Sequence, residues 1–325
     1  MIPRQNLDAV RTIVTHDSCA DGTASAIILR DAYAGKGVGI RFIQYGSDAH
    51  RNLQPEPGML FCDITPVAEM AREFVQAGAI VLDHHRTARG IVEQFGESGV
   101  FADENAEPGV CGAVLAYREV WRVLEPSFNV FDPQTDQDVS RAKFIHEFAT
   151  LAGIRDTWQR KDARWEEACA QSSVLSFVPN ERWLQKSLSE IADSWKQDYE
   201  WLGLMLQDKH ARDVARTAAK GWPFTTEKGV RVLIIPSTQT SDVAELLDDK
   251  YDLVVGFGYT FDPLIGYPQM ILSTRSHTTF DCSTFCRSHG GGGHTKAAGC
   301  SFKVGPDMLN PYEFIEGLIR AYPAR

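Results

Sequence analysis

The sequence has no long apolar run. No stretch approaches the roughly 18 residues that cross a bilayer, and the start, Met1-Ile2-Pro3-Arg4-Gln5-Asn6, lacks the apolar segment of a secretion signal. We therefore expect a cytoplasmic protein with no membrane partner. Basic residues are also few, because 33 Lys and Arg are set against 43 Asp and Glu, for a net charge of −10. A surface of that sign repels a long phosphate backbone, which argues against long duplex DNA but not against short nucleotides bound in one basic pocket.

The chain has neither a Cys-x-x-Cys pair nor an internal repeat. Its seven cysteines are an odd number spread over a long chain, so we predict reduced thiols and no disulfide framework. Cys282 and Cys286 are spaced like residues on one face of a helix, which favours packing over a metal site. At 325 residues the chain exceeds what one hydrophobic core usually organises, and two domains are expected.

Apolar runs and helical periodicity alternate in the first half of the chain. The predicted strands are 10–15, 40–45, 58–62 and 79–82, and the predicted helices are 22–34, 66–77, 109–122 and 139–151. Pro66 is placed in the first turn of its helix. The succession predicts an α/β domain with an open, mostly parallel sheet and helices on both faces.

A stretch at 181–220 has no proline and a single glycine, and its apolar residues recur at three- and four-residue steps. It predicts a connector helix, which Gly221-Trp222-Pro223 ends. A smaller C-terminal α/β domain is expected next, with strands at 230–235, 252–257 and 269–274 and helices at 242–249 and 310–320. The predicted division is a first domain at 1–165, a helical connector at 166–221 and a second domain at 222–325.

Three predicted strands of the first domain end in an acid or a histidine. The first ends at His16-Asp17 with Asp21 beyond, another at Asp63, and a third at Asp83-His84-His85. In an open parallel sheet the carboxyl ends of the strands share one edge, so these side chains are expected to converge on one crevice. A helix cap would explain one such carboxylate, but three strands that end this way indicate a site.

A cluster of carboxylates and histidines repels itself unless cations neutralise it. Imidazole mixed with carboxylate suits Mn²⁺ or Zn²⁺ better than Ca²⁺ or Mg²⁺, which prefer oxygen. There are enough ligands for two ions. Two ions about 3.5–4 Å apart can share a carboxylate and hold a hydroxide that attacks phosphorus in line.

The run from Gly290 to Gly299, GGGGHTKAAG, is the most informative stretch of the second half. Glycines let the backbone approach a ligand closely with free N–H groups. The surrounding segment, from Arg275 to Lys296, carries three basic residues and three histidines against the single acid Asp281. A locally basic, glycine-rich segment on an acidic protein indicates a site for a phosphate or a carboxylate.

Asp83-His84-His85 at the end of a buried strand, with the distal Gly-Gly-Gly-His-x-x-Ala-Ala-Gly, resembles the DHH phosphoesterase superfamily, in the subfamily with a C-terminal DHHA1 domain. The resemblance covers nearly the whole chain. The family includes oligoribonucleases, phosphatases of 3′-phosphoadenosine 5′-phosphate, cyclic-dinucleotide phosphodiesterases and RecJ single-strand exonucleases. It implies a first, catalytic domain that binds a pair of Mn²⁺ ions and a second domain that holds substrate.

The resemblance also implies roles for individual residues. The implied metal ligands are His16, Asp21, Asp63 (bridging), His84 and Asp156. His85 resembles the residue that contacts and polarises the substrate phosphate, and Asp83 would orient the histidines. The implied substrate-binding residues are Arg275, Ser276, Gly291, Gly292, Gly293 and His294.

The first motif departs from the family pattern. The family has a histidine followed by Asp-x-Asp, whereas this chain has His16-Asp17-Ser18-Cys19-Ala20-Asp21, with Cys19 in place of the first aspartate. Three interpretations stay open: Cys19 binds metal as a thiolate, Asp17 replaces the missing carboxylate, or the first metal site is weaker or prefers Zn²⁺.

These features predict a two-metal phosphodiesterase or exonuclease that releases 5′-mononucleotides from short single-stranded oligonucleotides. Within the same class, a phosphatase of 3′-phosphoadenosine 5′-phosphate or a cyclic-dinucleotide hydrolase is the alternative. In another class, the alternative is a nucleotide-binding sensor whose altered first motif has lost catalysis. The helices at 109–152 are a candidate surface for a homodimer, although apolar helix faces are more often core.

Overall fold

The computed structural model describes residues 2–103, 106–125, 136–262, 267–305, 308 and 310–322. The chain separates into two compact units, Met1–Gln207 and Asp208–Arg325, which are considered one at a time. The predicted division at residues 165 and 221 stays a prediction. Among the helices of the described segments, none combines the length and the apolar character needed to cross a membrane.

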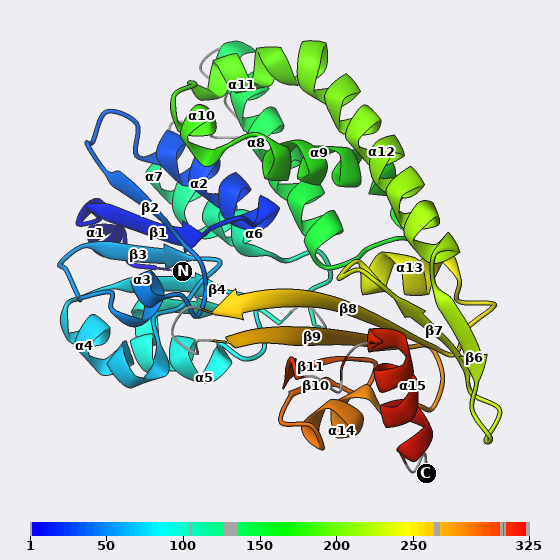
Figure 1. The fold of residues 1–325 in the computed structure, drawn as a ribbon. Helices are drawn as coiled ribbons and strands as arrows, with labels where there is room; N and C mark the ends of the chain where they lie inside the picture. The colour runs from blue at the N-terminus through cyan, green and yellow to red at the C-terminus, as the bar shows by residue number, and fades with distance from the viewer. Residues whose placement is uncertain are drawn as a thin grey trace. The chain divides into compact units, whose positions relative to one another are not determined.

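The first unit contains a five-stranded sheet in the order β2-β1-β3-β4-β5 (Figure 1). Its strands are β1 (Thr12–His16), β2 (Gly39–Ile43), β3 (Met59–Cys62), β4 (Ile80–Asp83) and β5 (Gly99–Phe101). Every neighbouring pair is parallel, which confirms the expected sheet. Only the three-residue β5 at the edge was not predicted.

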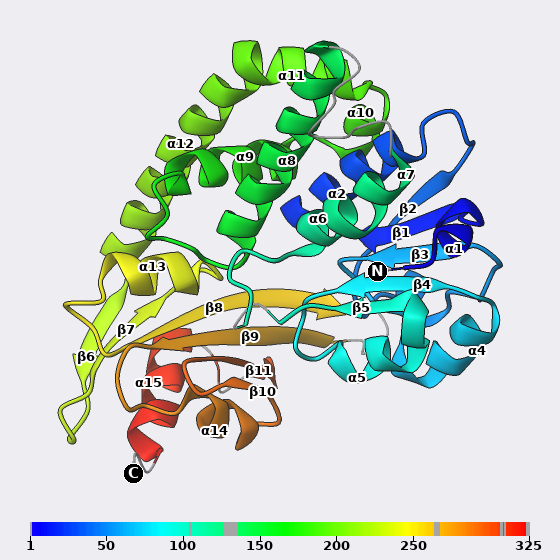
Figure 2. The same ribbon diagram turned by 180° about the vertical axis from the view of Figure 1, so that it is seen from behind.

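Helices cover both faces of this sheet, as Figures 1 and 2 show. The helices of the first unit are α1 (Arg4–Asp8), α2 (Ala20–Ala32), α3 (Asp48–Arg51), α4 (Ala71–Gln76), α5 (Arg89–Val92), α6 (Gly112–Leu115), α7 (Arg122–Leu124), α8 (Asp136–Asp156), α9 (Trp165–Phe177), α10 (Asn180–Leu184) and α11 (Leu188–Ser194), with 3₁₀ segments at Ala68–Met70 and Glu93–Ser98 and π-helical segments at Ala116–Trp121 and Trp195–Tyr199. Ile13 and Leu60 pack in the core under α2, α6 and α8, whereas Val14 and Phe61 pack in the core on the α4 side. Alternate strand residues thus feed two apolar layers, and this explains why the strands are continuously apolar.

Two predicted helices differ from the structure. Pro66 lies outside its helix, which begins with the 3₁₀ segment at Ala68. The predicted single helix at 181–220 is interrupted between α10 and α11, where Ser187 and Glu190 form a reciprocal capping box that starts a new helix. From Leu188 the chain then runs through the π-helical segment into α12 (Glu200–Ala219). Leu184, Leu188 and Ile191 keep helical spacing across the break, so the apolar periodicity alone did not reveal it.

The second unit is built on a mixed six-stranded sheet in the order β10-β11-β9-β8-β7-β6. Its strands are β6 (Trp222–Thr225), β7 (Arg231–Ile235), β8 (Leu253–Asp262), β9 (Tyr267–Ser276), β10 (Gly292–His294) and β11 (Ala297–Lys303), and its helices are α13 (Thr240–Leu246), α14 (Cys282–Arg287) and α15 (Pro311–Ala321). Only β7 and β8 pair in parallel. Cys282 and Cys286 are buried on α14, as expected of packing residues. A parallel α/β unit followed by a second α/β unit confirms the predicted fold class.

Candidate metal centre

Three parallel strands deliver side chains to one edge of the first sheet. His16 is the last residue of β1, Asp63 directly follows β3, and Asp83 ends β4 before His84 and His85. Because β3 lies between β1 and β4 in the sheet, these residues come together although they are far apart in the sequence. The predicted convergence is therefore present in the structure.

His84 lies at the centre of the first group of ligand-type atoms. Its Nε2 is 3.4 Å from Asp63 Oδ1 and 3.4 Å from Asp156 Oδ2, and 3.7 Å from Asp21 Oδ2. Asp156 is the last residue of α8 and Asp21 lies in the first turn of α2. Three carboxylates around one buried imidazole nitrogen, at distances longer than direct hydrogen bonds, leave space of the kind that a coordinated cation fills.

Backbone amides at the start of α6 hold the Asp21 carboxylate. Gly112 N donates to Asp21 Oδ2 at 2.6 Å and Ala113 N donates to Asp21 Oδ1 at 2.8 Å. A Cβ at Gly112 would lie 2.6 Å from Asp63 Cβ, so no larger residue fits there without movement. Sequence reasoning missed this support. The sequence feature that could have indicated it is the run of small residues Cys111-Gly112-Ala113 near the start of a predicted helix, where backbone amides are free to bind a carboxylate.

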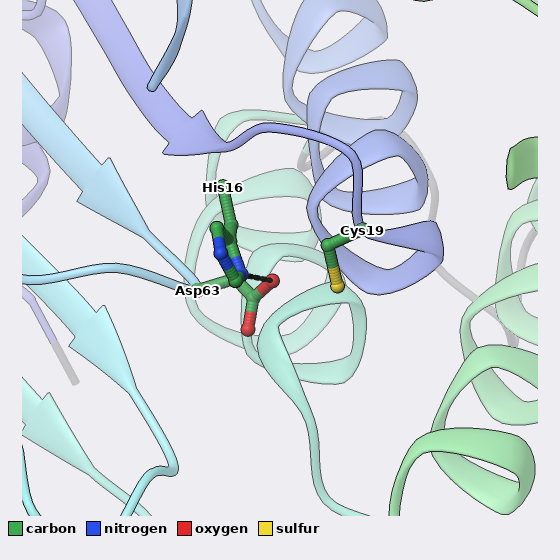
Figure 3. Close-up of side chains that lie close together, drawn as sticks. All are labelled: His16, Cys19 and Asp63. Atoms are coloured by element: carbon green, nitrogen blue, oxygen red, sulfur yellow. Dashed lines mark ion pairs between the residues drawn. The ribbon is translucent and has the colours of Figure 1, made fainter. Parts of the chain in front are cut away.

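A second group consists of His16, Cys19 and Asp63, each of which offers one ligand atom within 4.8 Å of the others. Figure 3 shows these side chains lying close together, at the end of β1, before the start of α2 and after the end of β3. His16 Nδ1 is 3.8 Å from Asp63 Oδ2. Asp63 has a φ of 63°, which is left-handed and which Asp and Asn adopt more readily than most residues.

Asp63 also forms a group with His84 and His85, so its carboxylate lies between the two sets of ligands. It is 2% exposed. Burial, together with the neighbouring Asp21 and Asp156, raises the pKa of Asp63 well above its ordinary value. Asp63 Oδ2, His16 Nε2 and both ring nitrogens of His84 are buried without a hydrogen-bond partner among the described residues. Buried polar atoms without partners are costly, and divalent cations would satisfy them, so these residues fit a metal centre.

Asp83 and His85 form a separate contact beside this group. His85 Nδ1 is 2.8 Å from Asp83 Oδ1, and the His85 amide donates to the same oxygen at 2.8 Å. This hydrogen bond raises the pKa of His85, and its side chain is 46% exposed. The arrangement makes His85 available as a proton donor to an anionic ligand, with Asp83 fixing its ring.

The structure separates the two candidates of the first motif. Burial is the main reason why the pKa of the Cys19 thiol is raised in the metal-free protein, and Asp63 and Asp21 add to it. The Asp17 carboxylate instead accepts hydrogen bonds from the Ser18 amide at 2.8 Å and from Asn180 Nδ2 at 3.0 Å. Cys19 thus belongs to the ligand group, while Asp17 fastens the loop to α10.

Two hollows in the first unit adjoin the ligand groups. One, of about 330 Å³, is lined by His16, Asp63, Asp83 and His85 together with Gln44 and Tyr45. The other, of about 360 Å³, has Cys19, Asp21 and Asp156 in its lining together with Arg155 and Trp158. The Arg155 guanidinium lies 4.2 Å from the centre of the Trp158 ring. Tyr45 and Trp158 are more than one-third exposed and offer faces on which a base could stack. Neither was singled out from the sequence.

The second unit contains the predicted substrate-binding residues. Arg275 and Ser276 end β9, and the Arg275 guanidinium, whose pKa burial lowers, donates to Ser241 Oγ at 2.8 Å and to Thr274 O at 2.8 Å. Gly292, Gly293 and His294 form β10, which pairs antiparallel with β11. Gly291 precedes β10, and a Cβ there would lie 2.1 Å from Gly299 O. The glycines therefore allow close strand pairing, and His294 is exposed on that edge.

Several solved structures have a similar fold. A pGpG-specific phosphodiesterase, PggH from Vibrio cholerae, matches with a TM-score of 0.54 and 13% identity over 95% of this chain and 99% of that chain. The DHH domain of a member of the s1p family of ribosomal proteins matches with a TM-score of 0.60 and 13% identity over 98% and 87%. The exonuclease RecJ bound to manganese matches with a TM-score of 0.53 and 16% identity over 99% and 94%. No family model and no curated protein sequence matches. At these identities the similarity establishes the fold.

Proposed function

Because the chain has the fold of the DHH phosphoesterase superfamily, we propose that it is a two-metal phosphodiesterase, with Mn²⁺ as its metal, that releases 5′-mononucleotides from short single-stranded oligonucleotides. The observation that carries the proposal is the buried His84 nitrogen with three carboxylates 3.4–3.7 Å away. Both ring nitrogens of His84 and Asp63 Oδ2 are buried without a hydrogen-bond partner among the described residues, and bound cations would satisfy them. The manganese-bound RecJ supports the choice of metal.

Each residue has a distinct part in the proposed reaction. When bound, divalent cations supply acidified water and neutralise charge at phosphorus. Asp63, between the two ligand groups, would hold both positions together. Asp21 is kept in place by the α6 amides. His85, oriented by Asp83, would donate a hydrogen bond to a phosphoryl oxygen, where negative charge develops.

Several features support a short nucleotide as substrate. The hollows beside the ligands are about 330 and 360 Å³, a volume suited to a nucleotide-sized ligand. The net charge of −10 disfavours long duplexes. The second candidate function is a phosphodiesterase specific for dinucleotides and not for longer oligonucleotides. The similar fold of a pGpG-specific phosphodiesterase favours it.

A substrate panel tests the proposal. Oligoribonucleotides and oligodeoxyribonucleotides of graded length, pGpG, cyclic dinucleotides and 3′-phosphoadenosine 5′-phosphate would be incubated with the protein and Mn²⁺, Co²⁺, Zn²⁺ or Mg²⁺, and products identified by chromatography. We expect mononucleotides from the shortest oligonucleotides with Mn²⁺. Asp63→Asn, which keeps the left-handed backbone accessible, should lower kcat by at least about 10³-fold.

Two results would overturn the proposal. Normal turnover by Asp63→Asn would show that Asp63 is not part of the reaction centre. Tight nucleotide binding with no hydrolysis and less than one metal ion per chain would show that the protein is a nucleotide-binding sensor.

A further inference from the structure

The two ligand groups of the metal centre differ in chemistry. Asp21, His84 and Asp156 offer one nitrogen and two oxygens, whereas His16, Cys19 and Asp63 offer one nitrogen, one sulfur and one oxygen. Sulfur is a softer ligand than carboxylate oxygen, and thiolates favour Zn²⁺ and Co²⁺ over Mn²⁺. The same centre therefore presents two positions of unequal preference.

We propose that Cys19 is a thiolate metal ligand and that its position, shared with His16 and Asp63, selects a softer divalent ion than the position formed by Asp21, His84 and Asp156. The inference rests on the proposed two-metal centre but specifies its composition. Binding releases the Cys19 thiol proton to solvent as the sulfur–metal bond forms. The protein as purified from a mixture of metals would accordingly be a mixed-metal enzyme.

The local backbone fixes the sulfur in this group. Ser18 has a φ of 55°, and a Cβ at Gly22 would lie 2.2 Å from His16 O, so the loop from β1 into α2 is tightly closed. Cys19 then stands at the N-cap of α2, at the end of this closed loop. Its sulfur lies within 4.8 Å of ligand atoms of His16 and Asp63, and Figure 3 shows the three side chains close together.

Two buried polar atoms beside Cys19 independently indicate that a metal ion binds at this position. Within the described part of the chain Asp63 Oδ2 and His16 Nε2 have no hydrogen-bond partner, and Asp63 is 2% exposed. Asp17, the other carboxylate of the loop, is held by Asn180 Nδ2 at 3.0 Å, and Asn180 in turn accepts from Thr23 Oγ1 at 2.8 Å. The Asp17 carboxylate is thus used in the contact with α10. The Cys19 sulfur is the third ligand atom beside His16 and Asp63, and it comes from the loop that directly follows His16.

Co²⁺ titration of the metal-free full chain tests the sulfur directly. A thiolate bound to Co²⁺ gives an intense charge-transfer absorption in the near ultraviolet. We expect this band in the wild-type protein and in the control Cys169→Ser, which changes a thiol on α9. Cys19→Ser and Cys19→Asp should lack the band but still bind Co²⁺, seen in its visible absorption.

Metal competition tests the selectivity. After equilibration with Zn²⁺ and a large excess of Mn²⁺, which offsets the tighter binding of Zn²⁺ to nitrogen and oxygen ligands, elemental analysis of the wild-type chain should find both metals. Cys19→Asp, which restores the carboxylate of the family pattern, should lower the Zn²⁺-to-Mn²⁺ ratio by about tenfold. Cobalt spectra without the charge-transfer band, or equal metal ratios in the two proteins, would overturn the proposal.

The outcome is separate from that of the proposed function. A charge-transfer band in a protein that hydrolyses none of the nucleotides would leave the Cys19 assignment standing and reject the activity. A protein that binds no divalent ion would reject both.

Discussion

At the scale of single residues, Asp63 combines requirements that conflict in the absence of metal. It is buried beside Asp21, Asp83 and Asp156, and its pKa is raised well above the ordinary value of 3.8. Its ionised form is therefore unfavourable in the metal-free protein, although ligand function requires that form. In the proposed metal centre Asp63 would thus lower the stability of the metal-free protein in return for metal affinity.

This conflict predicts that Asp63→Asn stabilises the metal-free protein. A folded-state pKa above the unfolded value means that the folded protein binds more protons, so its stability falls as pH rises above about 4. Removing the charge should increase the free energy of unfolding by about 1–3 kcal/mol at neutral pH. At pH values below the ordinary pKa, where Asp63 is protonated in both states, the difference should vanish.

Thermal unfolding of both proteins after chelation, from about pH 4 to pH 7, measures this effect. Added Mn²⁺ should then raise the Tm of the wild type and leave that of Asp63→Asn nearly unchanged. A metal-free Asp63→Asn less stable than wild type at neutral pH would contradict the electrostatic account.

The residue scale is where the sequence was most informative. His16, Asp63 and His84 could be placed at strand ends because each follows an apolar run, and parallel strands bring their ends to one edge. The support of Asp21 by the amides of Gly112 and Ala113 could not be predicted, since it joins residues more than 90 positions apart. The roles of His16, Asp63 and His84 as metal ligands stay predictions that the experiments above test.

At the scale of elements, glycine has opposite effects on stability in two helices. Gly203 lies in α12, and a Cβ there would be 2.6 Å from Ala170 O on α9. Gly317 lies in α15, and a Cβ there would meet no atom within 4 Å. The first glycine permits close helix packing, whereas the second only weakens its helix.

The two positions predict opposite changes of stability. Gly203→Ala should destabilise the protein by about 1–3 kcal/mol, because α12 must move away from α9. Gly317→Ala should stabilise it by about 0.5–1 kcal/mol through helix propensity. Chemical denaturation followed by circular dichroism measures both. Stabilisation by Gly203→Ala would show that the helices adjust without cost.

Element boundaries depended on contacts that periodicity does not report. Short strands such as β5 and β10 exist because neighbours supply hydrogen-bond partners, β4 for the former and β11 for the latter. The glycine run is typical of a linker or loop, and its strand conformation follows from the small Ala297 and Ala298 across the ladder.

At the scale of the whole molecule, each unit has its own hydrophobic core. We assign metal-dependent hydrolysis to the first unit and substrate binding to the second. The metal ligands come from Met1–Gln207, and the basic, glycine-rich segment from Asp208–Arg325. Variants in the two units should therefore change different kinetic constants.

We expect His294→Ala to raise KM for short oligonucleotides by about tenfold while kcat and metal content stay close to wild type. His294 is exposed on β10. Ser301→Ala, an exposed position on the adjacent β11, serves as the control and should change neither constant. Steady-state kinetics and elemental analysis make the comparison. A fall in kcat with lost metal and unchanged KM would contradict the division of roles.

The sequence by itself determined the parallel sheet, the clustering of acids and histidines at its edge and the presence of a second α/β unit. These depend on hydrophobic period and strand direction, which are local properties of the chain. Tertiary structure alone places Cys19 beside His16 and Asp63, ties Asp17 to Asn180 and brings the α6 amides to Asp21. Each of these follows from hydrogen bonds and close contacts between distant segments, which only the folded chain brings into reach.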